Sequence, residues 1–253
     1  MLNVDVYIPI RLGSERLPKK ALKKIDGVPI IKYLIERLEN ASNIRNIIVC
    51  TTISKSDDEL ADYLSKEKIL FFRGNEHDIL DRYLNTAKKF QTDYIVNVEG
   101  DDIYTDSDCV EIISKNLVNS NLDYVDINDM PFGLSTSGIS FSALNKICSV
   151  KKSKNTETGY KQFFTNTGLF KISHIDLKQS YYFPKNTRLS LDYEEDFQLA
   201  KEIFSILGNN FHKSDLSKLF KNNPNLLKIT DGLEERYNLH FTQNQTDIST
   251  KDI

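Results

Sequence analysis

The chain has 253 residues, of which 40% are hydrophobic and 27% are charged, a composition typical of a soluble globular protein. Its formal net charge of -3 argues against a protein that binds nucleic acid over its whole surface, and no apolar run reaches the roughly 18 residues of a membrane span. Three cysteines without CxxC spacing and an N-terminus without a secretory signal predict a cytoplasmic protein with reduced thiols.

The first half of the chain alternates short apolar runs with amphipathic stretches. The apolar runs predict strands at residues 4–10, 47–51, 69–72 and 94–98. Helical spacing of apolar residues predicts helices over 30–38 and 79–87, and the capping box Ser56-Asp57-Asp58-Glu59 predicts the start of another. Strands that alternate with helices in this way predict right-handed βαβ units and an α/β fold with a mostly parallel central sheet.

The second half is less regular. Residues 128–187 mix short apolar pieces with glycines and predict an α+β insertion that closes over one edge of the sheet. A short strand is expected at 188–192, then a helix that ends near Gly208 and a further helix over 214–220. The whole pattern predicts one domain over residues 1–241, which contains the insertion, and a polar, mobile C-terminal tail at 242–253.

A basic loop follows the first predicted strand. It reads Arg11-Leu12-Gly13-Ser14-Glu15-Arg16-Leu17-Pro18-Lys19-Lys20 and contains neither a GxGxxG fingerprint nor a P-loop. In an open parallel sheet, ligands bind beyond the carboxyl ends of the strands, where this loop begins. Arginine and lysine suit phosphate oxygens, and Gly13 allows a ligand to approach the backbone closely. We therefore interpret the segment as a polyphosphate-binding loop; the alternative is a solvated basic loop.

Carboxylates follow two later strands. Glu99-Gly100-Asp101-Asp102 comes after the fourth predicted strand, and Asp192 ends the short strand at 188–192. Carboxylates that face a basic loop would repel a bare triphosphate, but they suit a hard divalent cation placed between them and the phosphates. Two alternatives stay open, namely an Asp-rich turn that caps the next helix and an Asp192 that caps the helix after it.

The four histidines predict neither a zinc site nor a catalytic triad. His77 lies in a polar loop, and His174, His212 and His240 are scattered without partners at metal-site spacing. The sequence also lacks the GxSxG elbow of a serine hydrolase. These observations direct attention to the basic loop and the carboxylates.

Taken together, the segments resemble the sugar-activating cytidylyltransferases, a family that includes CMP-Kdo synthetase, the acylneuraminate cytidylyltransferases and the SpsF group. RGNEHDILDRY, VNVEGDD and RLSLDYEEDFQLAKEIF are similar to three family segments in the same order, so the resemblance spans about residues 4–207. The family pattern RxGSxRLPxKxL is matched by Arg11, Gly13, Ser14, Arg16, Leu17, Pro18, Lys20 and Leu22.

The resemblance implies a Rossmann-like nucleotidyltransferase fold of the GT-A type, CTP as donor, Mg²⁺ as cofactor and a homodimer formed through the insertion. It implies catalytic roles for Arg16, Lys20 and Asp101, and metal ligation by Asp101 and Asp192. The nucleotide-binding residues that it implies are Ile10, Arg11, Leu12, Gly13, Ser14, Arg16, Lys19, Lys20, Asp78 and Arg82.

Departures from the family pattern concern the acceptor. Lys19 stands where many relatives have glycine, Glu99 replaces Gln or Thr, and Asp102-Ile103-Tyr104 replaces a Glu-Pro-Leu or Cys-Pro-Leu pattern. We expect Glu99, Asp102 and Tyr104 to bind a small anionic acceptor, first of all a phosphorylated amino compound such as L-glutamine phosphate. In that hypothesis Glu99 attracts the acceptor's ammonium group and Lys19 its phosphate, and the product serves capsule or surface-polysaccharide modification.

Residues 129–139 and 158–167 are expected to complete the acceptor surface, with Phe132, Phe163 and Phe164 as core or dimer contacts.

In the expected reaction an acceptor oxygen attacks the α-phosphorus in line and pyrophosphate leaves, so positioning and charge neutralisation dominate. The alternatives are a CMP-sugar synthetase that acts on a ulosonic acid such as Kdo or sialic acid, a metal-dependent glycosyltransferase, and a nucleotide-sensing module without activity.

Overall fold

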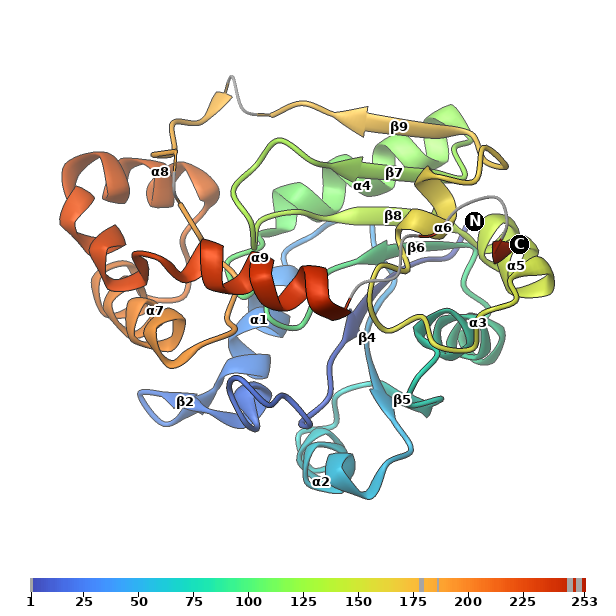
Figure 1. Cartoon of the computed structure of the whole chain (residues 1–253), viewed down its shortest axis with the longest axis horizontal. Helices are drawn as coiled ribbons and strands as arrows, with labels where there is room; N and C mark the ends of the chain where they lie inside the picture. The colour runs from blue at the N-terminus through green and yellow to red at the C-terminus, as the bar shows by residue number, and fades with distance from the viewer. Residues whose placement is uncertain (1, 178–179, 186, 245–247, 249–251) are drawn as a thin grey trace.

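A seven-stranded sheet with the strand order β5-β4-β1-β6-β8-β7-β9 forms the centre of the computed structural model (Figure 1). The structure describes residues 2–177, 180–185, 187–244, 248 and 252–253. Within these residues β8 alone runs antiparallel to its neighbours, so the sheet is mostly parallel, as predicted. The strands are β1 (Val4–Pro9), β4 (Asn46–Thr52), β5 (Phe71–Gly74), β6 (Tyr94–Asn97), β7 (Tyr124–Ile127), β8 (Ser137–Ser140) and β9 (Ile172–Ile175).

Helices cover both faces of the sheet, and β1 shows why its apolar run is continuous. Val6 and Ile8 belong to one hydrophobic core and Tyr7 to the other, because successive side chains point to opposite faces. The first core takes apolar residues from α1 (Ile30–Leu38), α2 (Asp58–Lys66), α4 (Ser107–Ser120), α7 (Glu194–Leu207) and α8 (Lys213–Asn222). The second takes them from α3 (Ile79–Phe90), α5 (Phe141–Val150) and α6 (Gln162–Thr165).

The strands and helices predicted in the first half are present, but the capping box at 56–59 is not. A short turn, η2 (Lys55–Asp57), precedes α2, and Ser56 Oγ donates to Ser54 Oγ. Asp57 accepts hydrogen bonds from the backbone nitrogen of Leu12 at 2.7 Å and from the hydroxyl of Thr52. The capping box does not form because the N-cap of α2 is Asp57, one residue after Ser56, and the carboxylate of Asp57 instead holds the start of the basic loop.

Residues 128–187 supply β8 and β9 to the central sheet and α5 and α6 to its second face. The strand predicted at 188–192 is reduced to an isolated bridge between Phe132 and Arg188. The helices predicted after it are confirmed as α7, with Gly208 at its C-cap, and α8. The chain therefore reaches Asp192 along an irregular segment that lies beside residues 132–133.

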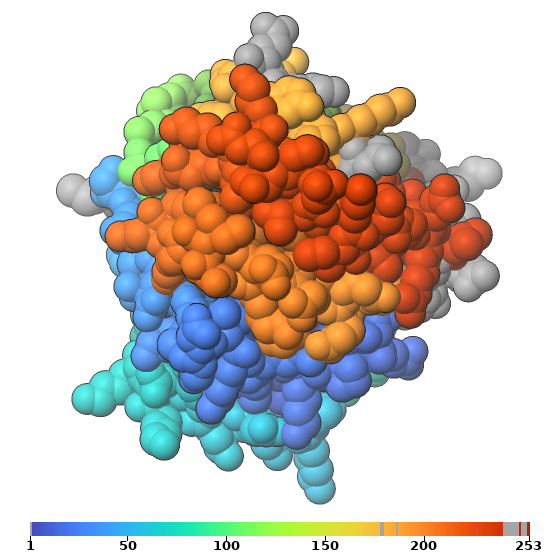
Figure 2. Space-filling model, turned by 90° about the vertical axis from the view of Figure 1, so that its left-hand side faces the viewer, coloured from blue at the N-terminus to red at the C-terminus, as the bar shows by residue number. Residues whose placement is uncertain are grey.

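The predicted polar tail at 242–253 begins inside a helix. η4 (Pro224–Thr230) leads to α9 (Leu233–Asn244), which crosses in front of the sheet in Figure 1. Ile248 is buried, and its backbone nitrogen donates to Gln162 Oε1 at 2.9 Å, whereas residues 245–247 and 249–251 lie outside the described residues. Figure 2 shows the region of α7, in orange, directly against the N-terminal segment in blue, with the later helices, in red, on its far side. No helix in the described part of the chain has the length and apolar character of a membrane span.

Candidate functional site

The basic loop is folded by its own backbone and leaves open space in front of Gly13. It passes through η1 (Lys20–Leu22) to a small hairpin of β2 (Lys24–Ile25) and β3 (Val28–Pro29). The nitrogen of Lys19 donates to the carbonyl of Leu12 at 3.3 Å, and the nitrogen of Leu17 donates to Ser14 Oγ at 3.3 Å. A Cβ built on Gly13 would meet nothing within 4 Å. The Cα of Gly13 therefore faces open space.

Lys20 joins the two predicted metal ligands. Its Nζ lies 2.6 Å from Asp101 Oδ2 and 3.3 Å from Asp192 Oδ1. The backbone nitrogen of Leu191 donates to the carbonyl oxygen of Asp101 at 2.9 Å, which fastens the segment that carries Asp192 to the loop after β6. Gly100 packs this loop against Ile10, since a Cβ at Gly100 would lie 2.6 Å from the Ile10 Cβ. Residues far apart in the sequence thus meet at the carboxyl end of β1.

Asp192 is surrounded by cations. Arg16 Nη2 lies 2.6 Å from its Oδ1, and Arg188 Nη2 lies 2.6 Å from its Oδ2, which also accepts from Ser190 Oγ at 3.0 Å. Burial alone would raise the pKa of Asp192, but Lys20, Arg16 and Arg188 outweigh it and hold that pKa below its usual value. Asp192 is therefore a carboxylate at neutral pH although its side chain is only 2% exposed.

The protonation states of Asp101 and Lys20 follow from the same contacts. Burial raises the pKa of Asp101, with Lys20 acting in the opposite direction. Burial would lower the pKa of Lys20, but Asp101 and Asp192 outweigh it and raise that pKa, so Lys20 is an ammonium ion. The site therefore combines a fixed cation with two acidic groups that share it.

Neither aspartate serves as a helix cap, which was the alternative left open by the sequence. The N-cap of α4 is Asp106, which accepts from the nitrogen of Cys109 at 3.2 Å. At the start of α7 it is Asp196 that accepts, at 2.9 Å each, from the nitrogens of Asp192 and Tyr193. The side chains of Asp101 and Asp192 are thus directed to Lys20 and not to a helix end.

This pair of carboxylates fits a hard divalent cation. Carboxylate oxygens are the ligands that Mg²⁺ prefers, and the side chain of Asp101 is 26% exposed, so an ion can reach it from solvent. In this structure Lys20 supplies the positive charge between the two groups. Asp101 and Asp192 are the residues that would hold the metal.

Arg11 and Arg82 are brought together through a residue that the sequence did not single out. Glu157 Oε1 lies 2.7 Å from Arg82 Nη2, and its Oε2 lies 3.8 Å from Arg11 Nε. Asp78 accepts from the nitrogen of Asp81 at 3.1 Å as the N-cap of α3, from Thr156 Oγ1 at 2.8 Å, and from Lys151. Asp78 and Arg82 are buried, so their side chains are not open to solvent.

Two of the predicted site residues lie elsewhere. Lys19 Nζ lies 2.5 Å from Glu59 Oε2, and both side chains are more than half exposed, so Lys19 points away from the carboxylates. Tyr104 is 2% exposed and packs against Phe204 and Phe211, with ring centroids 6.1 and 6.4 Å away. The structure therefore does not bring Lys19 or Tyr104 to the acceptor side, since one is held by a surface ion pair and the other lies in the core.

The comparisons with known proteins decide the family. A family model described as cytidylyltransferase matches residues 6–238 of the chain. The chain belongs to the cytidylyltransferase family. This cytidylyltransferase is therefore an enzyme that transfers nucleotidyl groups, in a family that uses CTP and generally a divalent metal.

Relatives with similar sequences match either most of the chain or less than half of it. The cytidylyltransferase is 32% identical over 203 residues to MJ1063, an uncharacterized protein of Methanocaldococcus jannaschii. The matched residues make up 80% of this chain and 83% of that protein. It is 22% identical to the spore coat polysaccharide biosynthesis protein SpsF of Bacillus subtilis, over 88% of this chain and 96% of SpsF. It is 35% identical over 108 residues to a 3-deoxy-manno-octulosonate cytidylyltransferase of Pelobacter propionicus. This match covers 40% of this chain and 39% of that protein.

Solved structures confirm the Rossmann-like nucleotidyltransferase fold. A cytidylyltransferase of Leptospira borgpetersenii matches with a TM-score of 0.81 and 25% identity, over 97% of this chain and 99% of that chain. A CMP:2-keto-3-deoxy-manno-octonic acid synthetase complexed with CTP matches with a TM-score of 0.61 and 14% identity, over 81% of this chain and 99% of that chain. At that identity the second likeness concerns the fold alone.

On the predicted acceptor side, Glu99 is paired with residues from the segment 158–167. Its Oε1 accepts from Tyr160 Oη at 2.7 Å and from Asn97 Nδ2 at 2.9 Å, and Lys161 Nζ lies 3.2 Å away. Burial would raise the pKa of Glu99, but Lys161 and these hydrogen bonds outweigh it and lower that pKa. Burial raises the pKa of Asp102 well above its usual value, and the neighbouring Asp101 and Glu99 add to the effect.

The sequence did not single out Glu157 or Arg188, and it included Tyr160 and Lys161 only as members of the expected acceptor segment 158–167. Arg188 stands four residues before Asp192 in the RLSLD segment, so its place in a matched motif was a usable signal. Glu157, Tyr160 and Lys161 lie in an irregular segment with no periodicity that could have marked them. Phe163 and Phe164 are buried in the second core, as predicted, whereas Phe132 is 45% exposed.

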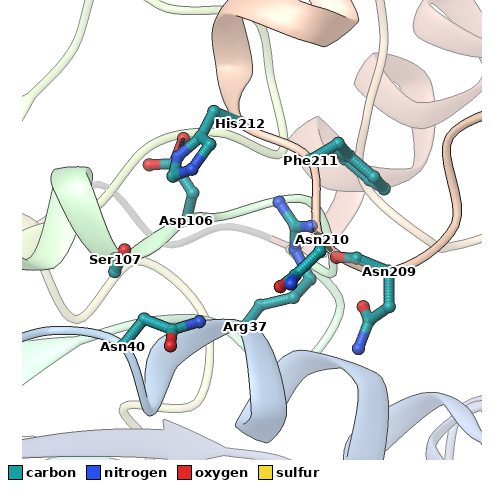
Figure 3. A pocket seen from close by; sticks show the side chains of 8 residues that line it. All are labelled: Arg37, Asn40, Asp106, Ser107, Asn209, Asn210, Phe211 and His212. Atoms are coloured by element: carbon teal, nitrogen blue, oxygen red, sulfur yellow. Dashed lines mark hydrogen bonds and ion pairs between the residues drawn. The ribbon is translucent and has the colours of Figure 1, made fainter.

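A small cavity of about 20 Å³ lies near the N-terminus of α4, with room for about one water molecule. Beside it, His212 Nδ1 lies 3.8 Å from Asp106 and 3.7 Å from Asp108, two carboxylates that the sequence spacing did not indicate as its neighbours. Lys213 Nζ lies 3.2 and 3.1 Å from the same two carboxylates and already supplies a positive charge there. Figure 3 shows the lining side chains, which are Arg37, Asn40, Asp106, Ser107, Asn209, Asn210, Phe211 and His212.

Proposed function

We propose that this cytidylyltransferase transfers CMP from CTP to a small anionic acceptor, with release of pyrophosphate, and that Mg²⁺ is its metal. The observation that carries this proposal is the meeting of Lys20 with Asp101 and Asp192, beside Arg16 and the open space at Gly13. Cations from one loop and carboxylates from two others are what a metal-bound nucleotide triphosphate needs.

In the proposed mechanism the protein supplies position and charge. Arg16 and Lys20 hold oxygens of the triphosphate and stabilise the charge that grows on the leaving pyrophosphate. Arg11, at the start of the same loop, adds a further positive charge. Mg²⁺ bound by Asp101 and Asp192 would neutralise phosphate oxygens when present. An acceptor oxygen attacks the α-phosphorus in line, and the bond to the β-phosphate oxygen breaks. If the acceptor atom belongs to a phosphate, with its second pKa near ~6, it is already ionised and needs no general base.

The acceptor that we propose is a phosphorylated amino compound such as L-glutamine phosphate, which would yield a CDP-linked product for capsule or surface-polysaccharide modification. Glu99 and Lys161 lie side by side at 3.2 Å, next to Asp102. A carboxylate and an ammonium group in contact complement the ammonium and carboxylate of an amino acid, which carries both charges. Lys19 takes no part in binding the acceptor, because it pairs with Glu59.

The test is a pyrophosphate-release assay on the purified full chain with CTP and Mg²⁺. The acceptor panel holds phosphorylated amino acids, phosphonates and ulosonic acids, and UTP replaces CTP in a parallel series. We expect turnover that needs CTP, the metal and a phosphorylated amino acid, and an Asp101→Asn variant to lose it. Pyrophosphate release from Asp101→Asn at the parent rate would remove the metal assignment, and a preference for a ulosonic acid would overturn the proposed acceptor.

A ulosonic acid is the second candidate acceptor, because the relative from Pelobacter propionicus is a 3-deoxy-manno-octulosonate cytidylyltransferase. The family assignment favours a nucleotidyltransferase over the metal-dependent glycosyltransferase and over the module without activity. The homodimer stays a prediction from the resemblance, and sedimentation velocity of the purified chain checks it.

A further inference from the structure

A tyrosine of α9 lies against both guanidinium groups that hold Asp192. The ring of Tyr237 is 5.1 Å from Arg16 Cζ and 4.8 Å from Arg188 Cζ, measured to the ring centroid. The ring of Tyr193 lies 5.4 and 5.8 Å from the same two atoms. A positive charge is attracted to the face of an aromatic ring at these distances. Two arginines that would repel each other are therefore separated by ring faces and by the shared carboxylate.

Arg188 depends on these rings more than Arg16 does. Its side chain is 3% exposed, and its Nη1 has no hydrogen-bond partner among the described residues. Phe132 completes the surroundings, with its ring 5.0 Å from Arg188 Cζ and 4.8 Å from the Tyr237 ring. Aromatic faces thus replace water around a buried cation that contacts Asp192 and Asp196 through its other nitrogens.

Other contacts hold α9 in this position. Arg236 lies over the ring of Tyr193 at 4.3 Å, and its Nη1 is 3.7 Å from Glu195 Oε1 at the start of α7. Leu233, in the first turn of α9, is buried at 4% exposure. The helix is therefore fixed on the segment that carries Asp192, and Figure 1 shows it crossing the front of the sheet.

We propose that Tyr237 is a positioning residue, whose ring keeps Arg16 and Arg188 aligned on Asp192 so that Arg16 can hold the nucleotide tail. This inference rests on the proposed function, since it assigns α9 to the same catalytic site. The charge of the hydroxyl group agrees with this proposal, because burial raises the pKa of Tyr237 and the nearby charges of Asp192 and Asp101 raise that pKa further. The hydroxyl is therefore neutral, and it is the ring face that acts on the cations.

The experiment measures CTP binding by isothermal titration calorimetry on the full chain with Mg²⁺, for the parent and three variants. Tyr237→Leu removes the ring, Tyr237→Phe keeps it, and Leu239→Ala is the control on an exposed position of the same helix, 68% exposed. We expect Tyr237→Leu to weaken CTP binding about tenfold, and Tyr237→Phe and Leu239→Ala to stay within about twofold of the parent. Thermal melting of each variant checks that the fold is kept.

A double-mutant cycle shows whether Tyr237 acts through the arginine. If it does, Tyr237→Leu combined with Arg16→Ala weakens CTP binding no further than Arg16→Ala alone. Independent, additive losses would overturn the proposal, and so would CTP binding by Tyr237→Leu at the parent affinity. A loss of equal size in Tyr237→Phe would assign the effect to the hydroxyl and also overturn it. A parent chain that binds no CTP would instead refute the proposed function, so the two failures are distinguishable.

Discussion

The backbone nitrogen of Leu191 donates a hydrogen bond to the carbonyl oxygen of Asp101 at 2.9 Å. This one contact ties together the two segments that supply the carboxylates of the site. Because it involves backbone atoms, it fixes the spacing of Asp101 and Asp192 whichever cation lies between their side chains.

Lys20 and Lys19 are neighbours in the chain, but we expect only Lys20 to matter for the rate of pyrophosphate release. Lys20→Met removes the cation that Asp101 and Asp192 share, and we expect pyrophosphate release to fall about 10²–10³-fold. Lys19→Met removes only an exposed ion pair with Glu59, so its rate should stay within about twofold of the parent. Steady-state assays of both variants with the acceptor identified from the panel make the comparison. Similar losses in the two variants would mean that net charge of the loop, and not the contact of Lys20, determines the rate.

Gly133 permits the close approach of two chain segments next to Asp192. Its φ is +98°, and a Cβ there would lie 2.1 Å from the carbonyl carbon of Leu189. Gly133→Ala should therefore destabilise the fold by about 3 kcal/mol or more, because the backbone has to move as well as adopt a strained conformation. Gly208→Ala is the matched control, with φ +70° and nothing within 4 Å of the added Cβ. Urea unfolding of both variants gives the two costs, and equal costs would show that the contact with Leu189 does not matter.

The sequence predicts the sheet and the meeting of Lys20 with Asp101 and Asp192 better than it predicts the surroundings of Glu99 and Tyr104. Strands buried on both faces give continuous apolar runs, and a matched motif singled out Lys20, Asp101 and Asp192, which the structure brings together. Tyr104 was misplaced because its direction depends on the turn in which the nitrogen of Thr105 donates to the carbonyl of Asp102. That turn sends the ring into the core, and no local pattern encodes it.

Contacts between distant segments were also beyond the reach of the sequence. Glu157 joins Arg11 to Arg82, and Tyr237 joins α9 to Arg16, across long stretches of chain. Each contact follows from how whole elements pack, and hydrophobic periodicity reports only that an element has an apolar face. The capping box at 56–59 does not form because α2 begins one residue later than the box requires, with Asp57 as its N-cap.

Gly13 tests where the nucleotide lies. An added Cβ would meet nothing within 4 Å, so Gly13→Ala should change the free energy of unfolding by less than about 0.5 kcal/mol. If the backbone of the loop lies against the nucleotide tail, the same methyl group should weaken CTP binding about tenfold. Urea unfolding and calorimetry with CTP and Mg²⁺ measure the two effects separately. An unchanged CTP affinity would place the ligand away from this part of the loop.

The buried pair of Asp106 and Lys213 should make stability depend on pH. Burial alone would raise the pKa of Asp106, but Lys213, whose Nζ lies 3.2 Å away, and backbone hydrogen bonds outweigh it and lower that pKa below its usual value. A carboxyl group with a lowered pKa contributes stability above its unfolded pKa, and this contribution is lost as the pH falls through the folded pKa.

Asp106→Asn keeps an N-cap for α4 but leaves the ammonium group of Lys213, which is 2% exposed, without this partner. At pH 7 we expect a loss of about 3–5 kcal/mol in the free energy of unfolding. The difference between variant and parent should shrink steadily as the pH falls below the usual aspartate value, because the parent then loses the same charge. Urea unfolding at several pH values measures this difference, with Asp108→Asn, at a side chain 52% exposed, as the control. A difference that is the same at every pH would show that hydrogen bonding, and not the charge of Asp106, stabilises this corner of the fold.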